Sequence, residues 1–193
     1  MNAQPNATFL STVWPESRDS FLRLGAVVVL GTLLLTASAK IQVPFWPVPM
    51  TMQTFVVLFL GAALGPRLGA LTVLLYLAQG AGGLPVFAGT PEKGLGIAYM
   101  AGPTGGYLIG FVAAASVVGW LAERGWDRSV LRLFVAMAVG HLVLFAFGVM
   151  WLAQLVGLEK AWLLGVVPFY AATIFKTALG ACLMPALWQL AKR

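Results

Sequence analysis

Charged residues are scarce in this chain. Asp, Glu, Lys and Arg make up 9% of its 193 residues, whereas they are about a quarter of an ordinary soluble domain. Because 60% of the residues are hydrophobic and the apolar runs are too long and unbroken for barrel strands, the sequence predicts an all-α integral membrane protein. We expect a short N-terminal tail at residues 1–19 and a single membrane domain at 20–193.

The residue patterns of catalysis, disulfides and metal binding are also missing. One cysteine, Cys182, excludes an internal disulfide. The chain contains no G-x-x-x-x-G-K-[ST] nucleotide loop, no H-E-x-x-H and no C-x-x-C. No acidic residue falls within a predicted span, so a catalytic carboxylate pair or triad has no place there. We therefore expect no enzyme, no cofactor and no metal site.

Six hydrophobic segments are present, separated by polar breaks or by breaks rich in Gly and Pro. The predicted helices cover residues 21–39, 51–64, 68–78, 106–122, 133–155 and 168–190. The second and third are short for a full span of about 20 residues. Gly65, Pro66 and Arg67 separate them, because Pro cannot continue a regular helix. Six crossings are the simplest count.

The basic residues are divided unequally between the two sides that six crossings define. The side of the two termini holds Arg18, Arg23, Arg67, Arg124, Arg128, Arg132, Lys192 and Arg193. The opposite loops hold Lys40, Lys93 and Lys160. This excess predicts that both termini are cytoplasmic. Because the bases are scattered singly rather than gathered in a patch, we expect the lipid bilayer as a partner and no nucleic acid.

One long connection is neither polar nor regular. Gln79–Tyr107 contains nine Gly among its 29 residues and three Pro, a composition that favours neither helix nor strand. Irregular backbone at membrane depth is tolerated only where protein buries it or where it lines a cavity. We predict that this Gly-rich loop and the Pro-rich stretch Ile41–Met50 cover a ligand cavity on the outer side. The alternative is a plain surface loop that closes two helices.

Lys176 is the only charge well inside a predicted span, about 12 Å along the last helix at 1.5 Å per residue. An intramembrane ionisable residue is costly and indicates function, and Thr173 lies on the same helix face. The alternative is a lysine that snorkels to the surface. Gln79, where the Gly-rich loop begins, is a further candidate for contact with a polar ligand group. His141 fits a hydrogen-bonded packing residue better than a ligand or a proton relay.

Three stretches of the chain closely resemble the BioY family, the biotin-specific substrate-binding (S) components of energy-coupling factor (ECF) transporters. They are IQVPFWPVPMTMQTFVVLFLGAALGPRLG (Ile41–Gly69), GGLPVFAG (Gly82–Gly89) and GPTGGYLIGF (Gly102–Phe111). The resemblance implies a six-helix S-component fold in the bacterial cytoplasmic membrane and high-affinity capture of biotin, unchanged, from the outer side. It also implies a transmembrane coupling protein and ABC-type ATPases as partners.

The resemblance further implies site residues. Those that match the family's binding loop are Gly102, Thr104, Gly105, Gly106 and Tyr107. Glycine in such a loop lets backbone amides approach a ligand closely. Lys176 matches a lysine of the family's last helix. Where the family typically has Pro-Gly-Asp, this chain has Ala171-Ala172-Thr173, and Thr173 is a weaker, uncharged acceptor.

Three other functions stay open on the sequence. The chain fits an S component for another small vitamin, because pocket specificity depends on few residues. An intramembrane enzyme that uses Lys176 or His141 belongs to a different class. A structural or assembly subunit would bind membrane partners and no small molecule.

The missing nucleotide loop generates a first prediction. We expect the purified chain alone to hydrolyse no ATP in a phosphate-release assay in detergent or liposomes, because it has no loop to hold the phosphates. ATP hydrolysis by the isolated chain would contradict the assignment as a binding component.

Overall fold

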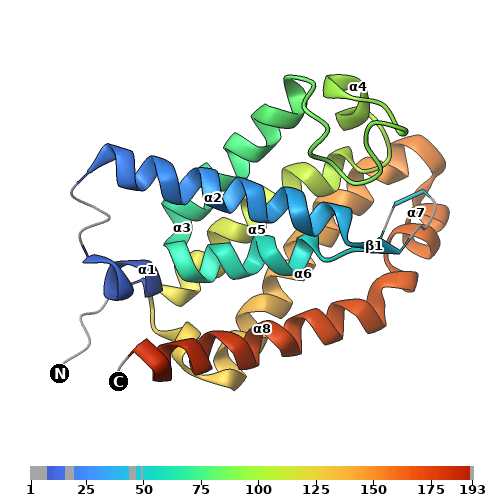
Figure 1. Ribbon diagram of the computed structural model, residues 1–193. Helices are drawn as coiled ribbons and strands as arrows, with labels where there is room; N and C mark the ends of the chain where they lie inside the picture. The colour runs from blue at the N-terminus through green and yellow to red at the C-terminus, as the bar shows by residue number, and fades with distance from the viewer. Residues whose placement is uncertain (1–7, 16–19, 44–46, 49, 192–193) are drawn as a thin grey trace.

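The computed structural model describes residues 8–15, 20–43, 47–48 and 50–191, which are almost entirely helical (Figure 1). Five helical stretches are long and apolar enough to cross a membrane: α2 (Phe21–Lys40), α3 (Gln53–Ala81), α5 (Gly105–Ala122), α6 (Val130–Val156) and Leu158–Ala191. The last stretch comprises α7 (Leu158–Gly165), η3 (Val167–Phe169) and α8 (Tyr170–Ala191). The shorter elements are α1 (Phe9–Val13), β1 (Gln42–Val43), β2 (Met50–Thr51), α4 (Gly96–Met100) and η2 (Trp126–Arg128).

Helix α3 is two helical arms joined at a sharp break. Gly65 has φ +82° and ψ 176°, a backbone conformation that favours glycine, and Pro66 begins the second arm. The arms fold back on each other, since a Cβ on Gly69 would lie 3.0 Å from the Cα of Gly61. The two arms count as separate spans, so the six-span prediction is confirmed in the described part of the chain.

Helix α5 lies at the centre of the bundle, between α3 and α6. A Cβ on Gly119 would lie 2.5 Å from the Pro66 nitrogen, and one on Gly61 would lie 2.5 Å from the Ala115 carbonyl oxygen. On the α6 side, a Cβ on Gly110 would lie 3.1 Å from the Leu144 carbonyl oxygen. Glycine at these crossings lets the helix backbones touch, which is how helices associate without water to drive them together.

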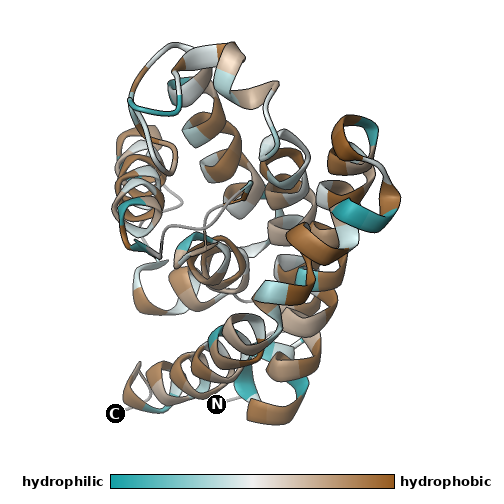
Figure 2. Ribbon diagram, turned by 90° about the vertical axis from the view of Figure 1, so that its right-hand side faces the viewer, coloured by the Kyte–Doolittle hydropathy of each residue, from teal (hydrophilic) through white to brown (hydrophobic). Residues whose placement is uncertain are grey.

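The outer helix faces are apolar. On α2, Leu30, Leu33 and Leu34 are exposed, as are Ile174 and Phe175 on α8. Figure 2 shows hydrophobic residues over most of the helical surface, with hydrophilic residues mainly at helix ends and connections. Such a surface suits contact with lipid chains. The all-α membrane fold predicted from the scarcity of charge is confirmed.

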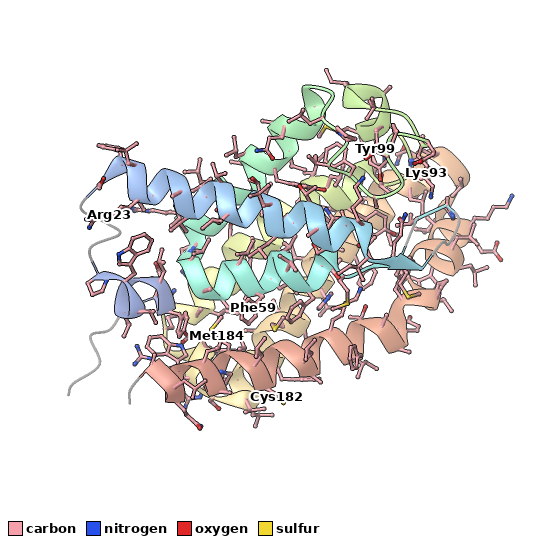
Figure 3. All side chains as sticks on the ribbon, in the orientation of Figure 1. Arg23, Phe59, Lys93, Tyr99, Cys182 and Met184 are labelled. Carbon is pink, nitrogen blue, oxygen red and sulfur yellow. The ribbon has the colours of Figure 1, made fainter. Side chains whose placement is uncertain are left out.

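Different short elements lie at the two ends of the bundle. Helix α1 and the C-terminal end of α8 lie at one end, while the strand pair, α4 and α7 lie at the other (Figure 1). Arg23 lies at the first end, and Lys93 and Tyr99 lie at the second (Figure 3). Figure 1 therefore places the predicted loop cover at the end opposite to α1.

Some local predictions were wrong. The Gly-rich loop was expected to contain no regular structure, yet α3 extends to Ala81 and α4 forms within it. Tertiary packing overrides the low helix propensity of Gly, because Tyr99 of α4 is buried and its hydroxyl donates to the Ala88 carbonyl at 2.8 Å.

Two segments read as irregular also contain secondary structure. In the Pro-rich stretch, Gln42 and Val43 pair with Thr51 and Met50, while Pro44 and Pro49 lie outside the described residues. The expected tail contains α1, capped where the Thr8 side chain accepts from the Ser11 N–H at 3.3 Å. Both segments are too short for their pattern to reveal a helix or a strand.

At one end of the bundle, three elements, α1, η2 and α8, meet around Trp188 and the buried carboxyl group of Asp127. The Trp188 indole N–H donates to Asp127 Oδ2 at 2.6 Å, Phe9 meets the Trp188 ring edge-on at 5.4 Å, and the Arg128 guanidinium lies 4.8 Å from the same ring. Burial raises the pKa of Asp127 to about 6, and the Trp188 hydrogen bond and the Arg128 charge offset the effect only in part.

We expect the stability of this end to fall as pH rises from about 4 to about 6. Between the ordinary pKa of 3.8 and the folded value of about 6, the folded protein holds a proton that the unfolded chain has released, so rising pH favours unfolding. Thermal unfolding in detergent across pH 4–7 should therefore show a steeper loss in wild type than in Asp127→Asn, which cannot ionise. Parallel curves for the two proteins would contradict this.

Candidate ligand-binding cavity

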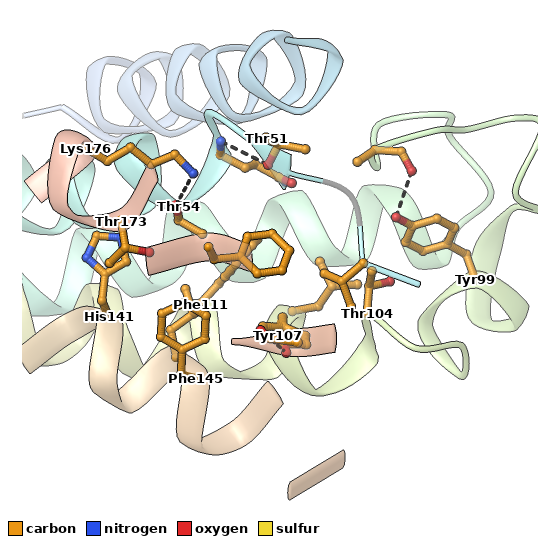
Figure 4. A pocket seen from close by; sticks show the side chains of 17 residues that line it. Thr51, Thr54, Tyr99, Thr104, Tyr107, Phe111, His141, Phe145, Thr173 and Lys176 are labelled. Atoms are coloured by element: carbon orange, nitrogen blue, oxygen red, sulfur yellow. Dashed lines mark hydrogen bonds between the residues drawn. The ribbon is translucent and has the colours of Figure 1, made fainter. Parts of the chain in front are cut away.

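A cavity lies between α3, α5, α6 and α8, with parts of both loops over it (Figure 4). The membrane helices supply most of the lining: Gln53, Thr54, Tyr107, Leu108, Phe111, His141, Leu144, Phe145, Thr173 and Lys176. The connections supply Val48, Thr51, Ala88, Tyr99, Thr104, Gly165 and Phe169. Residues from both the Pro-rich stretch and the Gly-rich loop therefore line it.

The lining divides into polar and aromatic parts. Lys176, Thr173 and His141 gather at one side of the view in Figure 4, with Thr54 beside Lys176. Phe111, Phe145 and Tyr107 form aromatic walls, and Tyr99 and Thr104 lie at the far side (Figure 4). A cavity with polar groups on both sides of an aromatic middle suits a small organic molecule of mixed polarity.

Lys176 is buried in the cavity wall, with 5% of its surface exposed. Its Nζ donates a hydrogen bond to Thr54 Oγ1 at 3.2 Å. An ammonium group has three N–H donors, and Thr54 is the one acceptor that the described part of the chain gives it. The snorkelling alternative is therefore wrong. Lys176 has donors available for a ligand in the cavity.

His141 is 2% exposed and lines the same cavity. Its Nδ1 lies 3.0 Å from the Met137 carbonyl oxygen and 3.1 Å from Thr177 Oγ1 on α8. Its Nε2 is buried and has no hydrogen-bond partner among the described residues. The sequence interpretation as a hydrogen-bonded packing residue describes only Nδ1. No pattern in the sequence indicates that α6 brings His141 into the same cavity wall as Lys176 of α8.

Two of the loop residues that match the family line the cavity, Thr104 and Tyr107. The Tyr107 ring packs edge-on against Phe145, with centroids 6.4 Å apart. Its hydroxyl donates to the Gly165 carbonyl at 2.8 Å, which ties α5 to the end of α7. Tyr107 thus offers the cavity an aromatic face rather than a free hydroxyl.

The three predicted glycines have a packing role in this structure. Gly102 gives its carbonyl to the Trp151 indole N–H at 2.9 Å. A Cβ on Gly106 would overlap Trp151, and one on Gly105 would overlap the Met100 carbonyl oxygen. They hold the loop against α6 and are not among the residues that line the main cavity. Gly102 lines a smaller hollow beside it, together with Lys93, Tyr99 and Thr104.

Gln79 also lies apart from the cavity lining. Its Nε2 donates to Thr32 Oγ1 at 3.3 Å, which connects α3 to α2. Of the eight residues predicted for the site, the structure therefore brings together Thr104, Tyr107, Thr173 and Lys176. A helix-end position indicated that Gln79 was near the loop, but did not indicate which neighbouring helix its amide would face.

Side chains of the Gly-rich loop itself and of helices α2 and α3 hold this loop in place. Phe87 stacks on Tyr99 with centroids 5.0 Å apart and meets Tyr76 edge-on at 5.5 Å. At the end of α2, Lys40 Nζ donates to the carbonyl oxygens of Phe87 and Thr90, each at 3.0 Å, and to Thr90 Oγ1 at 3.1 Å. A single ammonium thus fastens the Gly-rich loop to a membrane helix.

Fold and cavity together define a helical membrane protein with a cavity between its helices, lined by aromatic and polar side chains. The sequence model of the BioY family matches residues 11–193. The chain is 44% identical to a probable biotin transporter BioY of Pyrococcus horikoshii over 153 residues, which cover 79% of this chain and 88% of the relative. It is 38% identical to the biotin transporter BioY of Thermotoga maritima over 161 residues, covering 82% and 92%. The chain belongs to the BioY family.

The fold is similar to that of a solved protein. A crystal structure described as the S-component for biotin from an ECF-type ABC transporter matches with a TM-score of 0.73 at 23% identity, covering 89% of this chain and 92% of that one. The predicted S-component fold is confirmed. Because this is a family of transporters, the prediction that the chain is not an enzyme is also confirmed.

The Lys40 contact generates a prediction about the cover. In Lys40→Met, we expect faster hydrogen exchange of the backbone amides in residues 87–94, by roughly 10- to 100-fold, because removing charge-assisted hydrogen bonds costs about 1.5–3 kcal/mol. The measurement is exchange followed by mass spectrometry. Lys160→Met is the matched control, since the structure gives Lys160 no hydrogen-bond partner in the described residues. Unchanged exchange in Lys40→Met would contradict the fastening role.

Proposed function

We propose that this chain binds biotin and carries it across the cell membrane as the substrate-specific S component of an ECF-type transporter. Its membership of the BioY family, combined with the cavity that contains Lys176, is the observation that carries this proposal. The two relatives described above are named as a probable biotin transporter and a biotin transporter. The chain covers nearly the full length of both, so the proposal concerns the whole protein.

The chemistry of biotin supports the cavity as its site. Biotin joins an uncharged polar ureido ring to an apolar sulfur ring and an aliphatic chain that ends in a carboxylate. Phe111, Phe145 and the Tyr107 ring offer aromatic surface to the apolar part. Lys176 and Thr173 offer hydrogen bonds on one side, and Thr104 offers one on the other. We propose the four predicted residues that line the cavity as ligand contacts: Thr104, Tyr107, Thr173 and Lys176. We propose that the loop glycines support the Gly-rich loop.

The proposed orientation follows from the distribution of charge. The end of the bundle that carries α1 and the C-terminal end of α8 would face the cytoplasm, since Arg67 and Arg124 line a hollow beside α1 and Arg128 lies against Trp188 of α8. The loop cover would then face outward, and biotin would enter beneath it. A transmembrane coupling protein and ABC-type ATPases are the proposed partners for release inward.

The test is equilibrium binding of labelled biotin to the detergent-purified protein. We expect saturable binding to wild type, and a dissociation constant roughly 10- to 100-fold higher for Lys176→Ala, because a hydrogen bond from a charged donor contributes about 1.5–3 kcal/mol. Lys160→Ala is the matched control. Full binding by Lys176→Ala would remove Lys176 from the site.

The same assay separates the proposal from its alternative. Thr173, where the family typically has an acid, is the feature that keeps another small vitamin as a candidate ligand. Unlabelled vitamins of other classes should fail to displace biotin. A folded wild-type protein that binds one of them and not biotin would reassign the substrate.

A further inference from the structure

His141 belongs to the cavity wall and has a ring nitrogen without a hydrogen-bond partner among the described residues. Buried polar atoms in proteins nearly always have a hydrogen-bond partner, yet His141 Nε2 has none in the described part of the chain. The residue is 2% exposed and lines the cavity beside Thr173 and Lys176. Figure 4 shows the three side chains together. An unsatisfied nitrogen in a binding cavity is a place for a ligand atom.

The contacts of the other ring nitrogen decide what Nε2 can do. Nδ1 lies 3.0 Å from the Met137 carbonyl oxygen, which can only accept a hydrogen bond, so Nδ1 carries the proton. Thr177 Oγ1, 3.1 Å from the same nitrogen, holds the ring from α8. Since the Lys176 ammonium lies in the same buried cavity, a second positive charge there is unfavourable. The ring is therefore neutral, and Nε2 is an acceptor.

This side of the cavity thus contains a strong donor and an acceptor. A carboxylate has only acceptor atoms, and it would meet the lone pair of His141 Nε2. A cyclic urea has both a carbonyl acceptor and N–H donors, and it matches Lys176 and His141 at once. The Thr173 hydroxyl can take either role. The polar groups here fit the ureido ring of biotin better than its acid.

A smaller hollow adjoins the far side of the cavity. Lys93 lines the smaller hollow together with Tyr99 and Thr104, and these two residues also line the main cavity. The hollow and the cavity therefore share two lining residues. A carboxylate at the end of an aliphatic chain would lie on this side of the cavity.

We propose that His141 Nε2 accepts a hydrogen bond from a ureido N–H of biotin, with Lys176 donating to the ureido oxygen and the carboxylate directed toward the opposite end of the cavity, where Tyr99 and Thr104 lie. The assignment rests on the proposed function, because it presupposes that biotin binds in this cavity. It makes His141 a specificity-determining residue for the ligand's N–H groups.

Nitrogen NMR tests the acceptor directly in wild-type protein. The chain contains one histidine, so with a purification tag free of histidine both imidazole nitrogen signals belong to His141. We expect the free protein to show a protonated Nδ1 and an unprotonated Nε2, and saturating biotin to shift the Nε2 signal much more than the Nδ1 signal. An Nε2 signal that does not respond to bound biotin, or one that is protonated, would overturn the proposal.

Binding of modified ligands tests which group His141 reads. The probes are two biotin analogues, each methylated on one ureido nitrogen, and biotinamide, in which the carboxylate is an amide. In His141→Phe we expect biotin to bind roughly tenfold or more weakly. For one methylated analogue, the loss of affinity seen in wild type should largely disappear in this variant. The loss caused by biotinamide should be the same in both proteins.

Two outcomes of the ligand series count against the assignment. If His141→Phe binds biotin with wild-type affinity, the proposed hydrogen bond does not exist. If the variant abolishes the affinity loss caused by biotinamide rather than the loss caused by N-methylation, the ligand has the opposite orientation. His141→Gln, which keeps an acceptor, should recover part of the biotin affinity. A wild-type protein that binds no biotin at all would instead refute the proposed function, so the two failures are distinguishable.

Discussion

Backbone contact between α3 and α5 is the constraint on which the rest of the structure depends. In lipid, apolar side chains gain little by turning away from their surroundings, so helix association needs close packing. Gly61 and Gly119 provide it, because each brings its helix within contact of the other helix's backbone on either side of the Gly65–Pro66 break. The fold-back of α3 follows from this contact. With α3 folded and α5 central, α6 and α8 can enclose a cavity rather than collapse onto one another.

The cavity depends on the same economy of polar groups. Several buried side-chain polar groups connect one element to another: Gln53 Nε2 lies 2.6 Å from the Tyr76 hydroxyl, Tyr107 donates to Gly165, and Trp188 donates to Asp127. Lys176 and His141 keep unused hydrogen-bonding capacity within the cavity wall, whereas the unpartnered Asp127 Oδ1 and Arg128 Nε lie away from it. Unused capacity in a buried place is expensive. It is retained where a ligand completes it.

Much of the fold could be predicted from the sequence, because it depends on local composition. Long apolar runs and the Gly65–Pro66 break specify six spans, and a buried Lys176 follows from one charge within a span. The partners of the loop residues could not be predicted. The loop contacts Trp151 of α6 at Gly102 and Gly106, and Met100 of α4 at Gly105, while Gln79 contacts Thr32 of α2. These contacts depend on how the segments pack in three dimensions. His141 shows the same limit, since its role depends on how α6 and α8 are rotated.

The attachment at Lys40 gives α2 an influence that its position alone does not suggest. Of the five candidate spans, this helix has the smallest share of buried residues, 28%. Its last residue nevertheless holds the carbonyl groups of the cover. A change in the tilt of α2 would therefore move these carbonyl groups and the loop that carries them. The outer face of α2 and the position of this loop are thereby linked through one ammonium group.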